Sequence, residues 1–112
     1  MIRIALLMVV FSSLATASFA QDAALVKRGE AVYAAQKCSM CHAVAGKGNA
    51  KGTLDGVGSK LSADEIHQWI VAAPEMAAKT KAARKPLMKS YPNLSKEDVS
   101  ALVAYMQSMK KG

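Results

Sequence analysis

The chain has 112 residues, of which 15 are lysine or arginine and 8 are aspartate or glutamate, so its formal net charge at pH 7 is +7. This length accommodates one small domain rather than two. The positive charge suits an acidic protein, an anionic membrane surface or a nucleic acid as partner, and by itself it excludes none of them.

Residues 1–20 have the composition of a secretory signal peptide. Arg3 gives a positive start, an apolar run covers residues 4–14, and Ser18 and Ala20 are small residues at positions −3 and −1 of a cleavage site. An uncleaved membrane anchor is the alternative, but the run is shorter than the ~20 apolar residues of a spanning helix. We expect cleavage near Ala20, a periplasmic location and a mature domain of residues 21–112. Export argues against a nucleic-acid partner.

Residues 23–36 predict the first helix of the mature chain, with Asp22 as its N-cap. Apolar side chains recur on the face that carries Tyr33. Gly29 stands four residues before Tyr33 on that face. Because glycine weakens a helix interior, we expect another backbone to approach closely at Gly29.

Directly after this helix, Cys38 and Cys41 enclose two residues and His42 follows, which spells C-x-x-C-H. This motif is the attachment signal of c-type haem. Two thiols about one turn apart add to the two vinyl groups of one haem, and the imidazole of His42 becomes the proximal iron ligand. A redox disulfide would favour a strand–helix–strand context, which is missing, and a zinc site needs further ligands, of which only His67 is present. We therefore predict one covalently attached haem c per chain.

Two further segments follow the motif. Residues 46–58 contain five glycines and no strand pattern, so they predict a loop. Residues 62–73 predict the second helix, because Ser62 and Glu65 form a capping box and apolar residues recur at helical spacing after them.

The C-terminal third predicts two more helices. Residues 76–85 are rich in alanine and lysine and predict a short third helix, which Pro86 would end. Residues 95–110 predict the last helix, in which Ser95 and Asp98 repeat the capping pattern and an apolar stripe follows.

Haem iron has a second axial position, for which the mature chain offers His67 and five methionines: Met40, Met76, Met88, Met106 and Met109. Three of these methionines lie in the attachment turn or along the last apolar stripe, and His67 turns away from the apolar face of its helix. Met88 stands in an irregular segment between two helices, where a loop can present a thioether to the iron. Met76 follows a helix end and suits a packing role. The residues favour Met88 but leave Met76 and an empty site open.

The order of these features resembles small bacterial class I cytochromes c over nearly all of residues 23–110. The resemblance is carried by the helix that leads into C-x-x-C-H, the glycine-rich loop, the tryptophan-bearing second helix, and Met88 shortly before a capped terminal helix. It implies an all-α fold of three to five helices packed around one covalently bound haem. By position, Cys38 and Cys41 would be the thioether anchors, and His42 and Met88 the axial ligands.

The resemblance also implies two structural details. In this family the first and last helices cross closely at a glycine and an aromatic residue, a role that suits Gly29, Tyr33 and Tyr105. The family often has a proline whose carbonyl accepts the Nδ1–H of the proximal histidine, but Thr53 stands about where it is expected. Any residue supplies a carbonyl, so the bond is expected while its acceptor stays open.

An iron with both axial positions filled by protein leaves no site for a substrate, so we expect an electron carrier rather than an enzyme. The alternatives are a haem-based sensor or small-ligand binder with an open sixth position, and an electron-transfer subunit of a larger oxidoreductase. Five basic residues without an acid among them bracket Met88: Lys79, Lys81, Arg84, Lys85 and Lys89. They predict a redox partner with an acidic docking surface, such as a reductase, dehydrogenase or terminal oxidase. We expect a monomer with at most peripheral membrane contact.

Overall fold

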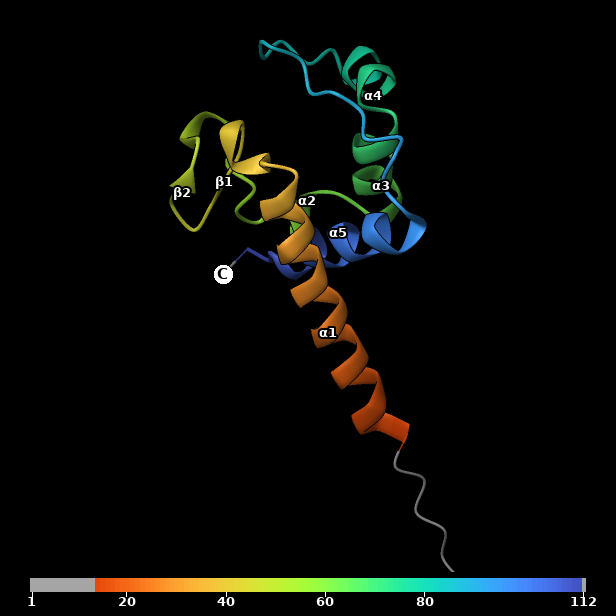
Figure 1. Ribbon diagram of the computed structural model, residues 1–112. Helices are drawn as coiled ribbons and strands as arrows, with labels where there is room; N and C mark the ends of the chain where they lie inside the picture. Colours follow the sequence, from red (N-terminus) through yellow and green to blue (C-terminus); the bar gives the residue numbers. More distant parts are fainter. Residues whose placement is uncertain (1–13, 112) are drawn as a thin grey trace, which may run out of the picture.

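The computed structural model describes residues 14–111, in which five α-helices are joined by short turns and one minimal hairpin (Figure 1). The helices are α1 (Leu14–Ala35), α2 (Val57–Lys60), α3 (Ala63–Val71), α4 (Ala73–Thr80) and α5 (Lys96–Ser108). Between α1 and α2 lie the 3₁₀ turns η1 (Cys38–Met40) and η2 (Ala50–Gly52), and the strands β1 (Ala43–Val44) and β2 (Lys47–Gly48). The predicted all-α class with three to five helices is confirmed. Most of the expected signal peptide lies in residues 1–13, outside the described residues.

The start of the first helix differs from its predicted start. We expected the helix to begin after Asp22, whereas α1 begins at Leu14 and runs through the predicted cleavage point. The stretch around that point, Leu14 to Asp22, contains no glycine or proline that would stop a helix. Asp22 is therefore an interior residue of α1 in the full chain and not its N-cap.

The glycine-rich loop contains structure that its residue pattern did not predict. β1 and β2 pair antiparallel, with Val44 opposite Lys47. Ala45 and Gly46 connect them with φ values of 50° and 79°, the double positive φ of a type I′ hairpin turn. Strands of two residues are too short to show alternation, which is why the sequence predicted only a loop. The helix α2 was also missed, because its four residues are too few to show the periodicity of a helix.

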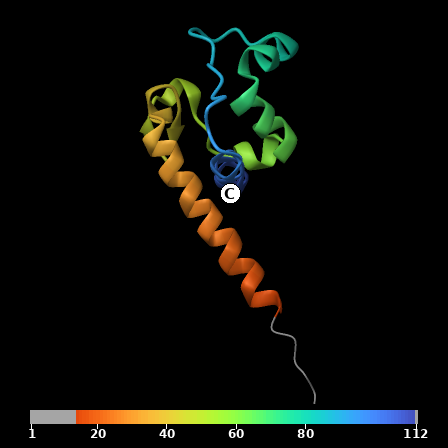
Figure 2. The same cartoon turned by 45° about the vertical axis from the view of Figure 1, so that its right-hand side comes forward.

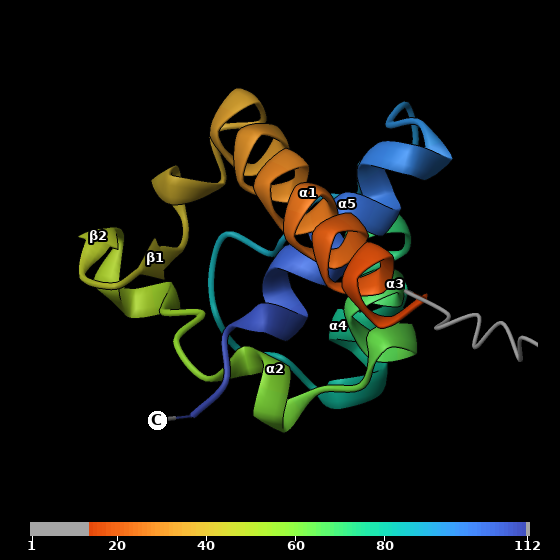
Figure 3. The ribbon, with the colours of Figure 1, turned by 90° about the horizontal axis from the view of Figure 1, so that it is seen from below.

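The first and last helices cross at the point where glycine was expected (Figure 3). A Cβ atom built on Gly29 would collide with the backbone carbonyl of Ala101 in α5. Next to this crossing, the rings of Tyr33 and Tyr105 meet edge to face, with centroids 5.7 Å apart. The predicted crossing of Gly29, Tyr33 and Tyr105 is therefore confirmed.

The capped helices also follow the prediction closely. Ser62 and Glu65 form the complete capping box at the start of α3. At the start of α5, the Ser95 hydroxyl accepts from the Asp98 amide, at 3.1 Å. The carboxylate of Asp98 instead pairs with Arg28 of α1, whose Nη2 lies 2.9 Å away. The first turn of α5 is thereby joined to α1 by the Arg28–Asp98 pair.

The third helix is shorter and earlier than predicted. α4 runs from Ala73 to Thr80 instead of covering residues 76–85. Pro74 occupies its first turn, where a missing N–H costs nothing, and Lys81 ends it in the left-handed conformation at φ 55°. The segment after α4 is consequently irregular over a longer stretch than expected.

The apolar core lies between α1, α3 and α5, and its buried members are Val32, Tyr33, Ile66, Ile70, Val99, Leu102 and Met106. In the view along α5 in Figure 2, the region around the hairpin and the α3–α4 arm stand on opposite sides, and the segment after α4 runs back between them. No helix in residues 14–111 is both long and apolar enough to cross a membrane.

Candidate haem site

The C-x-x-C-H motif is folded into a tight turn at the end of α1. Lys37 adopts a left-handed conformation, with φ 56°, and turns the chain away from the helix axis. The amides of Cys41 and His42 then both donate to the carbonyl of Cys38, at 3.1 and 2.9 Å. This turn places both cysteines and His42 in the wall of one cavity.

The cavity has a volume of about 670 Å³, within the ~300–1,000 Å³ usual for sites that hold a small molecule or cofactor. Its apolar wall comes from α2, α3, α5 and the adjoining loops: Leu54, Val57, Leu61, Ile66, Trp69, Ile70, Leu102 and Met106. Cys38, Cys41, His42 and Met88, which can bind a vinyl group or a metal, line the same cavity. The cavity can therefore hold a large flat apolar body with reactive groups at its edge.

The imidazole of His42 is oriented by a single backbone acceptor. Its Nδ1 lies 2.9 Å from the carbonyl oxygen of Gly52, and because a carbonyl only accepts, Nδ1 carries the proton. Burial lowers the pKa of His42, the Gly52 carbonyl opposes this effect, and the nearby charge of Arg84 lowers the pKa further. The ring is thus neutral at pH 7, with the lone pair of Nε2 free to bind a metal. The acceptor left open by the sequence is Gly52, one residue before Thr53.

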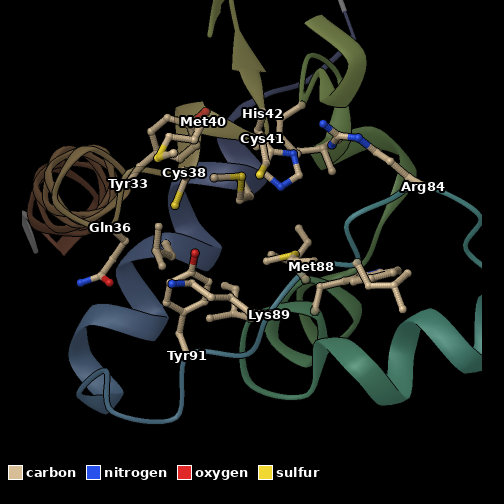
Figure 4. Close-up of a pocket in the computed structure, with 18 of the residues that line it drawn as sticks. Tyr33, Gln36, Cys38, Met40, Cys41, His42, Arg84, Met88, Lys89 and Tyr91 are labelled. Carbon is tan, nitrogen blue, oxygen red and sulfur yellow. The ribbon is translucent and has the colours of Figure 1, made fainter. Parts of the chain in front are cut away.

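Met88 and Met76 occupy different surroundings. Met88 lines the cavity, half-buried, across from His42 (Figure 4). Met76 is buried in α4 and is not part of the cavity wall. His67 is exposed on α3 and also lies outside the wall. Of the two methionines that the residues left open, the fold brings Met88 to the cavity.

The other methionines at the cavity have different roles. Met106 is buried in the apolar core and forms part of the far wall. Met40 lies within the attachment turn, and 71% of its surface is exposed at the cavity rim. Figure 4 shows Met40 on the same side of the cavity as His42, whereas Met88 lies across from it.

Comparison with known proteins decides the family. The sequence model of the family described as "Cytochrome c" matches residues 26–110. This chain belongs to the cytochrome c family. The cytochrome c chain is also similar to "Cytochrome c oxidase subunit 2" of Alkalihalophilus pseudofirmus (strain OF4), with 30% identity over 95 residues. That match covers 77% of this chain and 26% of the relative, so the chain spans about a quarter of the curated relative's length. No solved structure matches it significantly.

The residues of this cytochrome c fit the haem that its family binds covalently. Two thiols sit one turn apart at one side of an apolar cavity, and a neutral imidazole enters beside them with its free nitrogen toward the interior. A thioether lies opposite the imidazole. These are the donor types that hold haem c.

The charges around the cavity of the cytochrome c are all of one sign. The charged residues in its wall are Lys37, Arg84 and Lys89, and no acid lines it among residues 14–111. Lys89 places its Nζ 5.2 Å from the ring centroid of Tyr91, in cation–π contact. The five basic residues that bracket Met88 are all exposed. The cavity wall and the exposed segment around Met88 therefore both carry positive charge.

Sequence reasoning missed the contacts by which three residues shape this site, although it named Arg84 among the basic residues around Met88. Gly52 orients His42, and Arg84 packs directly on Gly52, where a Cβ would collide with its guanidinium. The Ser90 hydroxyl accepts from the buried amide of Ala73, at 3.0 Å. These contacts join positions 10 to 32 apart in the chain, and no local pattern encodes such pairs. Of these residues, only Gly52 could have been singled out from the sequence, because it directly precedes Thr53, the position at which the acceptor for His42 was expected.

Proposed function

We propose that this protein is an exported mono-haem cytochrome that carries single electrons between redox partners. The observation that carries the proposal is the joint placement of Cys38, Cys41 and His42 on one side of a single apolar cavity and Met88 on the other. Bound haem supplies a one-electron couple at its iron. The chain supplies the attachment, both axial ligands and a dry surrounding.

Each residue has a distinct part in this proposal. Cys38 and Cys41 would hold the haem through thioethers, each made by addition of the S–H to a vinyl group, so that no atom is released. His42 and Met88 would be the two ligands that the chain gives to the iron, so no open position for a substrate would remain. The thioether and the apolar wall both favour the reduced state, which raises the potential. Gly52 keeps the His42 ring in one orientation.

The location and partner belong to the same proposal. The signal peptide would be removed near Ala20, which would leave the domain in the periplasm. The exposed basic residues around Met88 would orient a redox partner with an acidic docking surface toward the cavity mouth. A dehydrogenase, reductase or terminal oxidase would suit this role.

A second candidate is an electron-transfer subunit within a larger oxidoreductase. The similarity to an oxidase subunit favours this candidate, because that relative is about four times longer than the matched region. The two candidates share the haem site and differ in whether the domain diffuses or stays bound. Co-purification of the tagged protein from mild detergent extracts distinguishes them, because a bound subunit elutes with a complex of defined size.

The proposal is tested with the purified mature protein. A denaturing gel should retain a haem-stained band, and acid–acetone extraction should leave the haem attached. The oxidised protein should show a low-spin spectrum with a weak sulfur-to-iron band near the red end, and carbon monoxide should not change the reduced spectrum. Extractable haem refutes covalent attachment. Ready binding of carbon monoxide would instead favour the sensor alternative.

A further inference from the structure

The segment that carries Met88 is tied to the rest of the molecule at one nearby point. The Ser90 hydroxyl accepts from the backbone amide of Ala73, at 3.0 Å. The amide of the next residue, Tyr91, donates to the carbonyl of Ile70, at 2.9 Å. We call these two bonds the Ser90 clasp. It fixes the chain two residues after Met88 to the junction between α3 and α4.

Within the described residues, backbone hydrogen bonds restrain this segment at few other points, and the side chain of Arg84, four residues before Met88, packs on Gly52. None of the backbone amides from residue 83 to 90 donates to a backbone carbonyl. The nearest backbone hydrogen bond before Met88 is made by Ala82, six residues earlier, whose amide donates to the carbonyl of Ala77. Pro86 and Leu87, just before Met88, are exposed. A segment with so few bonds opens at low free energy, so its nearest anchor controls the position of Met88.

The hydroxyl of Ser90 is the specific part of the clasp. Ala73 is fully buried, so its amide needs a partner. The residue before α4 is Ala72, which has no side-chain acceptor, and Pro74 has no N–H at all. The Ser90 side chain therefore caps the start of α4, although Ser90 belongs to the segment that carries Met88. The start of α4 and the position of Met88 are thereby coupled.

We propose that Ser90 is a positioning residue that keeps Met88 at the iron. This inference rests on the proposed function, in which Met88 is an axial ligand. Release of Met88 requires its segment to swing away from the cavity, which breaks the clasp. Without the Ser90 hydroxyl, the hydrogen bond to Ala73 no longer opposes the release of Met88. An external ligand then binds at the open position more readily.

The size of the effect follows from the strength of one hydrogen bond. A net contribution of roughly 0.5–1.5 kcal/mol corresponds to a change of about 2- to 12-fold in an equilibrium constant. The apparent affinity of the oxidised holoprotein for imidazole should therefore rise by about 2- to 12-fold in Ser90→Ala. Ser90→Thr, which keeps the hydroxyl, should stay within about twofold of the wild type.

The experiment titrates imidazole into the oxidised holoproteins and follows the visible spectrum. The matched control is Ser100→Ala, an exposed serine of α5 that should leave the affinity unchanged. Far-UV circular dichroism of each holoprotein checks the helix content. If Ser90→Ala gives too little protein, Ser90→Cys keeps the side-chain size with a weak acceptor and should also raise the affinity.

The outcomes separate the inference from the function on which it rests. Met88→Ala must bind imidazole much more tightly than the wild type; if it does not, the axial role of Met88 is wrong. If Met88→Ala binds tightly while Ser90→Ala behaves like Ser100→Ala, the clasp inference alone is overturned. A Ser90→Ala protein that loses stability but keeps wild-type imidazole affinity also overturns it, since Ser90 would then only cap α4.

Discussion

Single residues determine how the imidazole of His42 enters the cavity. Its Nδ1–H is bound by the Gly52 carbonyl, and the Arg84 guanidinium packs on the bare backbone of Gly52. The sequence predicted that such a carbonyl exists but not which residue supplies it. The choice depends on the path of the loop, which is set by the hairpin and by the 2.8 Å bond from the Ala45 amide to Asp55. Neither feature has a local pattern that could have been recognised.

Tyr33 carries a buried hydroxyl without a hydrogen-bond partner among the described residues. An unpaired buried hydroxyl costs roughly 1–3 kcal/mol. Tyr33→Phe removes the hydroxyl and keeps the ring, so we expect the holoprotein at pH 7 to be as stable as the wild type or up to about 2 kcal/mol more stable. Urea unfolding followed by circular dichroism measures this, and a loss above about 1 kcal/mol would show that the hydroxyl has a partner.

The same residue predicts a dependence on alkaline pH. Burial is the largest cause that raises the pKa of Tyr33, to about 12. An unfolded tyrosine ionises near pH 10. Above that pH the unfolded state loses this proton first, so the contribution of Tyr33 to stability falls as pH rises from about 10 to 12. Tyr33→Phe should lose less stability over this interval than the wild type does.

At the level of elements, the starts of α3 and α5 were predicted best. Ser62 and Ser95 act as the N-caps that their patterns indicated, because a cap depends on neighbours three residues apart. The start of α4 was predicted wrongly, because its cap is Ser90, 17 positions away. The crossing of α1 and α5 was predicted through the family resemblance rather than through spacing alone. The sequence did not predict an element correctly where that element depends on a residue far away in the chain.

The helix crossing can be tested at Gly29. A Cβ at this position would collide with the carbonyl of Ala101, which is backbone and cannot rotate away. Gly29→Ala should therefore lower the free energy of unfolding of the holoprotein by about 1–3 kcal/mol, although alanine favours helices. The control is Ala31→Ser, an exposed position of the same helix. Equal stability of Gly29→Ala and the wild type would mean that the helices do not pack this closely.

For the whole molecule, the fold creates one apolar cavity surrounded by positive charge. The exposed basic residues occupy α4 and the segment after it, and two of them, Arg84 and Lys89, line the cavity together with Met88. A charged partner is oriented by such a field before contact, and the effect weakens as salt shortens the Debye length from ~30 Å at 0.01 M to ~10 Å at 0.1 M.

Electron-transfer kinetics with an acidic redox protein test the docking surface. The second-order rate constant should fall by roughly tenfold between about 0.01 and 0.1 M salt. The double change Lys79→Glu and Lys85→Glu should reduce the low-salt rate constant as well. Lys60→Glu with Lys96→Glu makes the same charge change at exposed positions outside α4 and the segment that follows it, and should have a smaller effect. Equal effects of the two pairs would show that net charge, and not this surface, controls the encounter.

The central claim is that Met88 is the sixth ligand of a single haem in a carrier. Carbon monoxide binding to the reduced holoproteins tests it most directly, with wild type, Met88→Ala and Met76→Ala measured side by side. We expect Met88→Ala to bind carbon monoxide readily, because only this change opens the side of the cavity that faces His42. The wild type and Met76→Ala should not bind it. Ready binding by the wild type, or by Met76→Ala in place of Met88→Ala, would contradict the account.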